Sequence, residues 1–345
     1  MIRRLLPNPF ARLRRAGVLG MNARNASYIM ATNPRSRFPL VDDKRRTKHL
    51  AEAAGIAVPR LLGGIDSHHE LRALHEVVGP IEAGFALKPA HGSSGNGILV
   101  IRDRVGPYYR MTNGRLASRD ELEHHAANIL SGMHSLGGLP DAAMIEERVC
   151  FDDRFDDVSG GGVPDIRTVV YRGVPIMAMM RLPTHASDGK ANLHHGAVGL
   201  GIDLASGRSI SAVHHDRPVD EHPDSLAPLL GRAIPGWERL LELSARCYDL
   251  CGLGYLGVDV VLDRDRGPLV LELNARPGLS VQLATGAGLA PRLQAIDAAD
   301  ALPEAAADRA EFARERFAAA DAPVPVDEPA PISVMGRAAN ADRCA

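Results

Sequence analysis

The spacing of apolar side chains along the chain predicts helices that alternate with strands. Between Trp237 and Cys251, apolar residues recur every three or four positions, which indicates an amphipathic helix, and Gly252 follows as a stop signal. A second helix is expected from Asp42 or Asp43 to Ala54, directly before a glycine. Most of the expected strands lie between these two helices, and one expected hairpin follows the second helix.

Two serine residues have the spacing of a helix-capping box. Ser67 stands three residues before Glu70, and Ser118 stands three residues before Glu121. In a capping box the serine and glutamate side chains each accept a backbone N–H group at the start of a helix. Both positions therefore predict a helix start. The expected helices end near Val78 and Met133.

Short apolar segments bounded by glycine, proline or polar residues are expected to be strands. A tight turn at Arg172 and Gly173 separates two of them and predicts a hairpin. The expected strands cover residues 86–87, 98–101, 142–149, 166–171 and 175–181.

The most informative segment predicts a second hairpin, with strands over residues 257–263 and 268–274 and a four-residue turn between them. In that register Asp263 faces Pro268, and Asp259 faces Glu272 on the neighbouring strand. Asn274 lies two residues after Glu272 and therefore on the same face of the sheet.

This hairpin is a candidate metal site. Facing carboxylates on adjacent strands repel each other unless a cation lies between them, and an oxygen-only set of ligands suits Mg²⁺ that carries nucleotide phosphates. A solvated hairpin with ordinary surface acids is the alternative. The apolar residues Val258, Val260, Leu271 and Leu273 indicate a buried hairpin with little room for unpaired charge, which favours the metal site.

A glycine-rich loop after Lys88 is a candidate phosphate site. Backbone N–H groups approach phosphate oxygens closely where side chains are small, and a lysine adds a positive charge. The pattern does not match a P-loop, because it lacks the GxxxxGK[ST] spacing and does not open a helix. A flexible turn beside a surface lysine is the alternative. The loop contains Gly92, Ser93, Ser94, Gly95 and Gly97.

Two further groups of polar residues stand at expected strand ends. Glu146 and Glu147 leave a strand and either bind the adenine and ribose of a nucleotide or are solvated. The loop from Lys190 to Ala197 carries Asn192 and two adjacent histidines, which point in opposite directions if the segment is extended. Histidine doublets recur elsewhere in the chain, so a zinc site is not expected.

Composition narrows the class of protein. The 345 residues are 45% hydrophobic and carry a formal net charge of −2, so a globular protein is expected and no overall field favours nucleic acid. Four cysteines show neither zinc-ligand nor disulfide-dense spacing, which fits a reducing compartment. No apolar run approaches the ~20 residues that span a bilayer. A cytoplasmic protein is therefore expected.

The two ends of the chain differ from the middle. Residues 1–41 are basic and are expected to form an arm, which is either solvated or in peripheral contact with a membrane or a membrane protein. Residues 298–345 are rich in alanine and proline. A helix is expected over residues 305–320, and disorder is expected from Asp321 onwards, so most of this tail should lack structure.

The motifs occur in an order that resembles the ATP-grasp superfamily. The likeness is to the ribosomal-protein α-L-glutamate ligases and to their α-L-glutamate ligase-like branch, and it covers residues 42–283. The phrases that carry it are DDK, KPAHGSSGNG, DIR, MMR, NLHHGA and GVD followed by GPLVLELNARPGL. The resemblance implies an α+β fold in which two subdomains, residues 42–146 and 147–297, clasp ATP between antiparallel sheets.

The resemblance also implies the nucleotide contacts. Lys44 and Lys88 would contact the phosphates, together with the glycine-rich loop, and Asp165 would contact the ribose. The adenine would contact Glu147, Arg148 and Val149.

At the other end of the nucleotide, the resemblance implies a catalytic and metal-binding group. Arg181 would steady the transferring phosphoryl group, and Lys190 and Asn192 would lie over the nucleotide or an acyl phosphate. Two Mg²⁺ ions, with Mn²⁺ as a substitute, would be held by Asp259, Glu272 and Asn274.

The implied activity is that of an ATP-dependent carboxylate–amine ligase. A small-molecule or peptide carboxylate would become an acyl phosphate, and an amine would then displace phosphate to form an amide. Glutamate is one candidate substrate, but His195 and Arg276 stand where the ligases have arginine and serine. A phosphotransferase of the same fold and a nucleotide-binding module without turnover are the alternatives, and homo-oligomerisation stays open.

Overall fold

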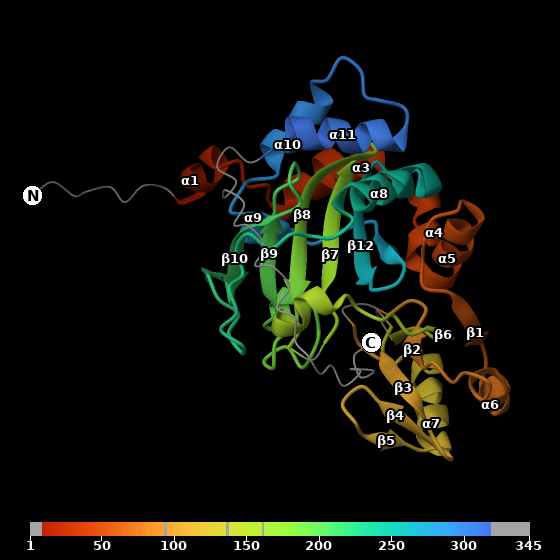
Figure 1. Ribbon diagram of the computed structural model, residues 1–345. Coiled ribbons are helices and arrows are strands. Elements are labelled where there is room, and N and C mark those ends of the chain that lie inside the picture. The colour runs from red at the N-terminus through yellow and green to blue at the C-terminus, as the bar shows by residue number, and fades with distance from the viewer. Residues whose placement is uncertain (1–8, 93–94, 136–137, 161, 319–345) are drawn as a thin grey trace, which may run out of the picture.

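Two antiparallel sheets, each with its own core, organise the protein. The computed structural model describes residues 9–92, 95–135, 138–160 and 162–318 (Figure 1). In these residues one sheet has six strands in the order β1-β6-β2-β3-β4-β5, and the other has seven in the order β11-β10-β9-β8-β7-β12-β13. The two sheets lie in separate lobes (Figure 1). This arrangement agrees with the α+β fold of two subdomains expected from the sequence.

The smaller lobe is built around the six-stranded sheet, with helix α7 packed on β2 and β6. Its core includes Leu74, Phe85, Leu122 and Ile145. Its strands are β1 (Leu61–Ile65), β2 (Phe85–Pro89), β3 (Leu99–Val105), β4 (Tyr108–Met111), β5 (Leu116–Ala117) and β6 (Ala143–Glu147). Its helical segments are η3 (Glu70–Ala73), α6 (Leu74–Val78) and α7 (Arg119–Leu130).

The larger lobe carries the predicted metal hairpin in its seven-stranded sheet. Its strands are β7 (Asp165–Tyr171), β8 (Val174–Leu182), β9 (Val198–Ile202), β10 (Ser209–His214), β11 (Arg217–Pro218), β12 (Tyr255–Asp263) and β13 (Gly267–Asn274). Helices α8 (Trp237–Cys251), α9 (Val281–Thr285), α10 (Ala290–Asp297) and α11 (Ala306–Arg316) pack on it or on one another. Two short helical turns, η5 (Asp153–Val158) and η6 (Leu193–His195), lie in its loops.

The expected helices are present with small changes. Helix α8 has the predicted bounds, and α7 begins with the capping box of Ser118 and Glu121. The other predicted box is different, because Glu70 starts a 3-10 turn and its carboxylate accepts the N–H of Asp66. The α-helix that was expected to start there begins only at Leu74.

The hairpin register was predicted correctly at the candidate site but not at the turn. Asp263 pairs with Gly267 rather than with Pro268. A bulge then skips Leu271, so that Asp259 still pairs with Glu272. One extra residue on β13 therefore offsets the shorter turn and keeps the two carboxylates opposite each other.

The N-terminal segment is part of the larger lobe rather than an arm along its whole length. Leu19, Tyr28, Ile29 and Val41 belong to the core of this lobe. Asn33 donates to the carbonyls of Tyr255 and Ala275 at 2.8 and 3.2 Å and accepts the Tyr255 N–H at 2.8 Å. The segment contains α1 (Pro9–Arg15), α2 (Met21–Ala23), the π-helix η1 (Arg24–Ile29), α3 (Met30–Thr32), η2 (Arg35–Arg37) and α4 (Pro39–Asp42).

The two cores divide the chain at places that differ from the predicted boundaries. Helix α5 (Lys44–Ala53), Ile56 and Val58 still contribute to the larger lobe, whose core resumes at Val149. The smaller lobe therefore starts near β1, not at residue 42. The helix expected over residues 305–320 is α11, and Ala313 is buried where α11 packs on α8. Residues 321–345, where disorder was expected, and the last two residues of the expected helix lie outside the described residues.

Within the part of the chain that the structure describes, no helix has both the length and the apolar character that a membrane crossing requires.

Candidate functional site

The centre of the candidate site is the carboxylate of Asp259 on β12. It is buried and accepts hydrogen bonds from two arginines. Arg167 on β7 donates from Nε to Oδ1 at 2.6 Å and from Nη2 to Oδ2, and Arg181 on β8 donates from Nη2 to Oδ2 at 2.9 Å. Although burial opposes ionisation, these two guanidinium groups hold the pKa of Asp259 well below its usual range.

Asp165 completes this cluster. Both of its carboxylate oxygens accept hydrogen bonds from Arg181, from Nε at 2.6 Å and from Nη2. Burial raises the pKa of Asp165 to about 6, and the negative charge of Asp259 adds to that rise. The contact of Asp165 with a ribose stays a prediction, and it requires the carboxylate to exchange or share its present partner.

Lys44 joins the metal hairpin to the glycine-rich loop. It is the first residue of α5, where Asp43 caps the helix by accepting the N–H groups of Arg45 and Arg46. Its Nζ atom lies 3.5 Å from Oε2 of Glu272 and donates to the carbonyl of Gly92. The predicted phosphate lysine therefore touches both halves of the candidate site.

Lys88 ends in a buried group of charges. Its ammonium contacts Oε1 of Glu146, and Lys48 lies 2.7 Å from Oε2 of the same carboxylate. The sequence reasoning identified Lys88, and it predicted Glu146 to be a nucleotide contact or a solvated acid, but it predicted neither their ion pair nor the role of Lys48. A helical spacing of four residues between Lys44 and Lys48 places both on one side of α5, and that spacing was the available signal.

The glycine-rich loop has the backbone conformation that glycine favours. The φ angles of Gly95 and Gly97 are +74° and +76°. Nε2 of His125 lies 2.9 Å from the carbonyl oxygen of Gly97. A Cβ atom on Gly95 would lie 4.0 Å from Cγ of Lys190, so this predicted active-site lysine lies beside the loop. Ser93 and Ser94 lie outside the described residues.

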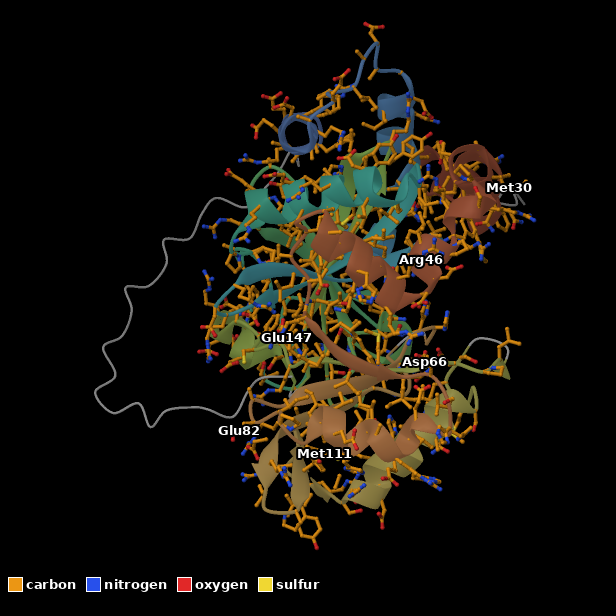
Figure 2. All side chains as sticks on the ribbon, turned by 90° about the vertical axis from the view of Figure 1, so that its right-hand side faces the viewer. Met30, Arg46, Asp66, Glu82, Met111 and Glu147 are labelled. Carbon is orange, nitrogen blue, oxygen red and sulfur yellow. The ribbon has the colours of Figure 1, made fainter. Side chains whose placement is uncertain are left out.

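The predicted adenine contacts lie where the chain passes from one lobe to the other, and Glu147 is seen there between the lobes (Figure 2). Its Oε1 atom accepts the N–H of Arg60 at 2.6 Å and lies 2.6 Å from Nη2 of Arg266. Arg148 is half-buried, and burial lowers its pKa. Val149 is buried in the core of the larger lobe. The structure therefore gives the side chains of Glu147 and Val149 other partners, and their adenine contacts stay predictions.

The remaining predicted residues lie in the loop before β9, at the end of β13 and just after β13. Asn192 accepts the N–H of His194 at 3.0 Å and so caps a short helical turn. The side-chain oxygen of Asn274 accepts the N–H of Arg276 at 2.9 Å. The guanidinium of Arg276 is exposed and lies 4.8 Å from the centre of the Phe38 ring. Arg276 is therefore held at its backbone while its charge faces solvent.

The donor set of the hairpin fits a magnesium ion. Asp259, Glu272 and Asn274 offer oxygen atoms only, which is the preference of this ion. Oδ1 of Asp259 accepts one hydrogen bond, from Arg167, and so keeps a lone pair, as does the Asn274 oxygen. Within the described residues, no three or more His, Cys, Asp or Glu side chains gather in a group that could hold a metal. Any ion here would therefore also rely on the asparagine and on substrate phosphates.

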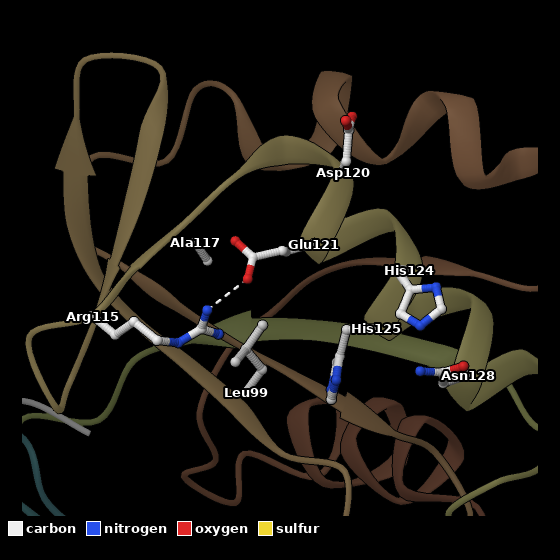
Figure 3. A pocket seen from close by; sticks show the side chains of 8 residues that line it. All are labelled: Leu99, Arg115, Ala117, Asp120, Glu121, His124, His125 and Asn128. Carbon is white, nitrogen blue, oxygen red and sulfur yellow. Dashed lines mark hydrogen bonds and ion pairs between the residues drawn. The ribbon is translucent and has the colours of Figure 1, made fainter.

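A separate cavity of about 390 Å³ opens on the smaller lobe beside α7 (Figure 3). Its lining includes Leu99, Arg115, Glu121, His124 and His125. An ion pair between Arg115 and Glu121 at 2.6 Å crosses it. None of the predicted site residues lines this cavity. The cavity is therefore distinct from the charged cluster between the lobes.

Comparisons with known proteins identify relatives of this chain. Residues 23–298 match a family model described as sugar-transfer associated ATP-grasp. A probable α-L-glutamate ligase of Syntrophotalea carbinolica is 23% identical over 252 residues, which cover 73% of this chain and 61% of that protein. The chain thus spans less than two thirds of this curated relative.

The chain is also similar, more distantly, to solved structures. The ATP-grasp ligase PsnB, complexed with a minimal precursor, Mg and ADP, is 17% identical with a TM-score of 0.43, over 77% of this chain and 61% of that one. The D-alanine–D-alanine ligase of Bacillus anthracis, complexed with ATP, is 14% identical with a TM-score of 0.41, over 81% of this chain and 66% of that one.

Proposed function

The chain belongs to the sugar-transfer associated ATP-grasp family, and from this premise we propose that it is an ATP-dependent ligase that joins a carboxylate to an amine. Family membership confirms the superfamily that the sequence motifs resemble. The proposed product is an amide or peptide bond, formed through an acyl phosphate.

One observation carries this proposal. Lys44 contacts Glu272 of the candidate metal hairpin and the carbonyl of Gly92 in the candidate phosphate loop. A lysine and a carboxylate of the larger lobe thus meet the backbone of the glycine-rich loop of the smaller lobe, and this meeting supports a phosphate site between them. Phosphoryl transfer depends mainly on such positioning and charge neutralisation, so no nucleophilic side chain is required.

The proposed reaction has two steps. An oxygen of the substrate carboxylate attacks the γ-phosphorus of ATP, the bond to the bridging oxygen breaks, and ADP leaves. The amine nitrogen then attacks the acyl carbon, phosphate leaves with the electrons of the C–O bond, and the nitrogen loses a proton. Bound Mg²⁺ would neutralise phosphate charge. The residues proposed to hold it are Asp259, Glu272 and Asn274.

The proposed roles of the other residues follow from their positions. Lys44 and Lys88 bind nucleotide phosphates, and Lys190 lies beside the loop that would cover them. Arg181 is fixed by Asp165 and Asp259, so its guanidinium is oriented before a substrate arrives. An oriented cation does not have to reorganise as charge develops on the transferring group.

Substrate choice is proposed to involve Arg276. Arg276 stands two residues after the proposed metal ligand Asn274, and its charge faces solvent and lies against the Phe38 ring. A guanidinium suits a carboxylate or another planar anion, because its N–H groups form a fork. Glutamate and an acidic peptide are therefore candidate substrates, and the curated relative is named as a probable α-L-glutamate ligase.

The N-terminal segment is proposed to contact an anionic surface. Residues 1–41 contain eight arginines and no aspartate or glutamate. In α1 the apolar side chains of Phe10 and Leu13 are 71% and 49% exposed beside Arg12, Arg14 and Arg15. Exposed apolar and basic side chains on one helix are typical of segments that lie on anionic membranes.

Release of ADP tests the enzymatic proposal. Purified protein would be supplied with ATP, Mg²⁺ and a panel of carboxylates and amines, and the product mass would be determined. A ligase releases ADP only when both substrates are present. A stable phosphorylated product made from one substrate alone would instead identify a phosphotransferase, and nucleotide binding without turnover for every pair would identify a binding module.

A further inference from the structure

A buried group of three charges lies behind the candidate phosphate site. Glu146 is 3% exposed and lies between Lys88 and Lys48, which are 6% and 1% exposed. Lys88 contacts one carboxylate oxygen, and Nζ of Lys48 lies 2.7 Å from the other. We refer to Lys48, Lys88 and Glu146 as the buried charge cluster. Burying charges with so little exposure costs free energy, so a contribution to stability does not by itself explain the cluster, and a functional role is indicated.

The cluster joins three elements from both lobes. Lys48 comes from α5, which packs on the larger lobe, whereas Lys88 and Glu146 lie on the neighbouring strands β2 and β6. Lys48 also donates to the carbonyl of Pro59 at 2.8 Å, in the segment that leads from one lobe to the other. Its ammonium is therefore fixed by two acceptors and cannot turn towards solvent without breaking both contacts.

The charges in the cluster do not cancel. One lysine would suffice to neutralise Glu146, yet two are present. If Lys88 were the sole partner, its charge would be compensated by the carboxylate and would attract phosphate weakly. Lys48 shares the carboxylate instead, so one positive charge is left over at the end of β2. An anion such as a phosphate group would complete the balance.

We propose that Lys48 is a positioning residue for nucleotide binding, which holds Glu146 and thereby orients Lys88 and keeps a net positive charge in the cluster. This inference rests on the proposed role of Lys88 in binding ATP phosphates. Lys48 itself is completely buried and touches no substrate, so it acts through Glu146 alone.

Lys48 titrates in an accessible range. Burial, and after it the positive charge of Lys88, lower the pKa of Lys48 to about 8 against the attraction of Glu146. The charged groups that face it are Glu146 on β6, Lys88 on β2 and Glu52 on its own helix. Above pH 8 Lys48 loses its proton in the free protein, and the positive charge that the cluster offers to phosphate falls. Nucleotide affinity should therefore decrease as the pH rises through this range.

The experiment measures MgADP affinity by titration calorimetry in the full-length protein. Lys48→Met removes the charge and keeps most of the length of the side chain, and we expect it to weaken MgADP binding about tenfold or more, the scale of one charged hydrogen bond. Lys48→Arg keeps a cation and should restore part of the affinity. Arg46→Met is the matched control, because Arg46 is exposed on the same helix and its loss should not change affinity.

Two comparisons separate this inference from simpler explanations. If Lys48 only stabilises the fold, Lys48→Met lowers the melting temperature but binds MgADP with the affinity of the wild type, and the inference is wrong. If Lys88→Met also binds MgADP normally, the phosphate role of Lys88 fails, and this inference with it. The proposed function is tested separately, by ADP release in the presence of both substrates.

Should Lys48→Met not fold, the wild-type protein still decides the question. MgADP affinity that stays constant between pH 7 and pH 9.5, at fixed Mg²⁺ concentration, would overturn the proposal. A decrease centred near pH 8 that is absent in Lys48→Arg would support it, because arginine keeps its proton throughout this range.

Discussion

Nη2 of Arg181 lies 2.9 Å from Oδ2 of Asp259, so the residue proposed to steady the transferring phosphoryl group is bound to a residue proposed to hold the metal. The same arginine binds both oxygens of Asp165. A change at Arg181, Asp165 or Asp259 should therefore affect the other two residues. Glu272, the hairpin partner of Asp259, lies outside these arginine contacts.

We expect Glu272→Gln to reduce Mg²⁺-dependent ADP release about a hundredfold or more, because it removes one of the two proposed carboxylate ligands. The side chain of Glu272 is 31% exposed, so the fold should survive. Steady-state ADP release and a melting curve would be measured together. Glu82→Gln, at an exposed position away from the site, is the control. Undiminished activity in Glu272→Gln would refute the metal assignment.

The pH dependence of the unfolding free energy should reflect the titration of Asp165. Its carboxyl pKa is raised on folding from 3.8 to about 6, so between these values the folded state keeps a proton that the unfolded state has lost. This group therefore makes the protein less stable as the pH rises from 4 to 6. We expect the unfolding free energy of the wild type to fall by about 2 to 3 kcal/mol relative to Asp165→Asn over this range.

Denaturant unfolding at several pH values would measure this difference. Asp165→Ala is a second reference, since it also lacks the titrating group. The relevant quantity is the slope with pH, because either variant changes the absolute stability by disturbing Arg181. Parallel curves for the wild type and both variants would show that Asp165 does not titrate in this window.

Arg276→Ser should alter substrate use while leaving nucleotide affinity within about twofold, because Arg276 is exposed and touches neither lysine of the phosphate site. If the guanidinium binds the substrate carboxylate, its loss should raise the KM for that substrate about tenfold or more, the scale of a hydrogen bond to a charged group. Arg276→Lys tests whether charge alone suffices. An unchanged KM for every active carboxylate and amine would exclude this role.

The basic N-terminal segment should bind anionic vesicles. Five of its arginines lie in residues 1–15, and each basic residue near an anionic surface contributes about 1 kcal/mol at moderate ionic strength. We expect co-sedimentation with vesicles that contain phosphatidylserine, and not with pure phosphatidylcholine, and we expect high salt to release the protein. Replacing Arg12, Arg14 and Arg15 by glutamate should abolish binding.

Arg217→Glu serves as the charge control for the vesicle experiment, since Arg217 is exposed on β11. A second variant, Phe10→Asp with Leu13→Asp, separates the apolar contribution from charge. If the triple arginine variant sediments like the wild type, the segment does not bind membranes. Preferential binding of a nucleic acid at equal charge density would redirect the proposal to that partner.

Local patterns predicted much of the fold and the centre of the site. The bounds of α8 and the pairing of Asp259 with Glu272 could be predicted from apolar spacing and from a short turn. The bulge at Leu271 could not, because the alternation of side chains along a strand does not show where one strand gains an extra residue. The predicted pairing is still correct, because the turn is one residue shorter than predicted and the bulge adds one residue to β13.

Contacts between segments that are far apart in the sequence could not be predicted from it. Arg167 binds Asp259 because β7 and β12 are neighbours in the sheet and these two residues are Cα partners. Glu146 likewise binds Lys48 and Lys88 because the fold brings their elements together. Only the alternation along a strand was visible in advance, which places Asp165 and Arg167 on one face but does not say which strand lies beside them.

Asn33 connects the start of β12 to the residue directly after β13, across 222 and 242 positions of sequence. During synthesis this asparagine leaves the ribosome long before either of its partners exists. The N-terminal segment therefore cannot pack, and the apolar side chains of Tyr28 and Ile29 stay exposed to solvent, until the hairpin has been synthesised. Contacts of such long sequence separation form slowly, so closure of the larger lobe should be a late event in folding.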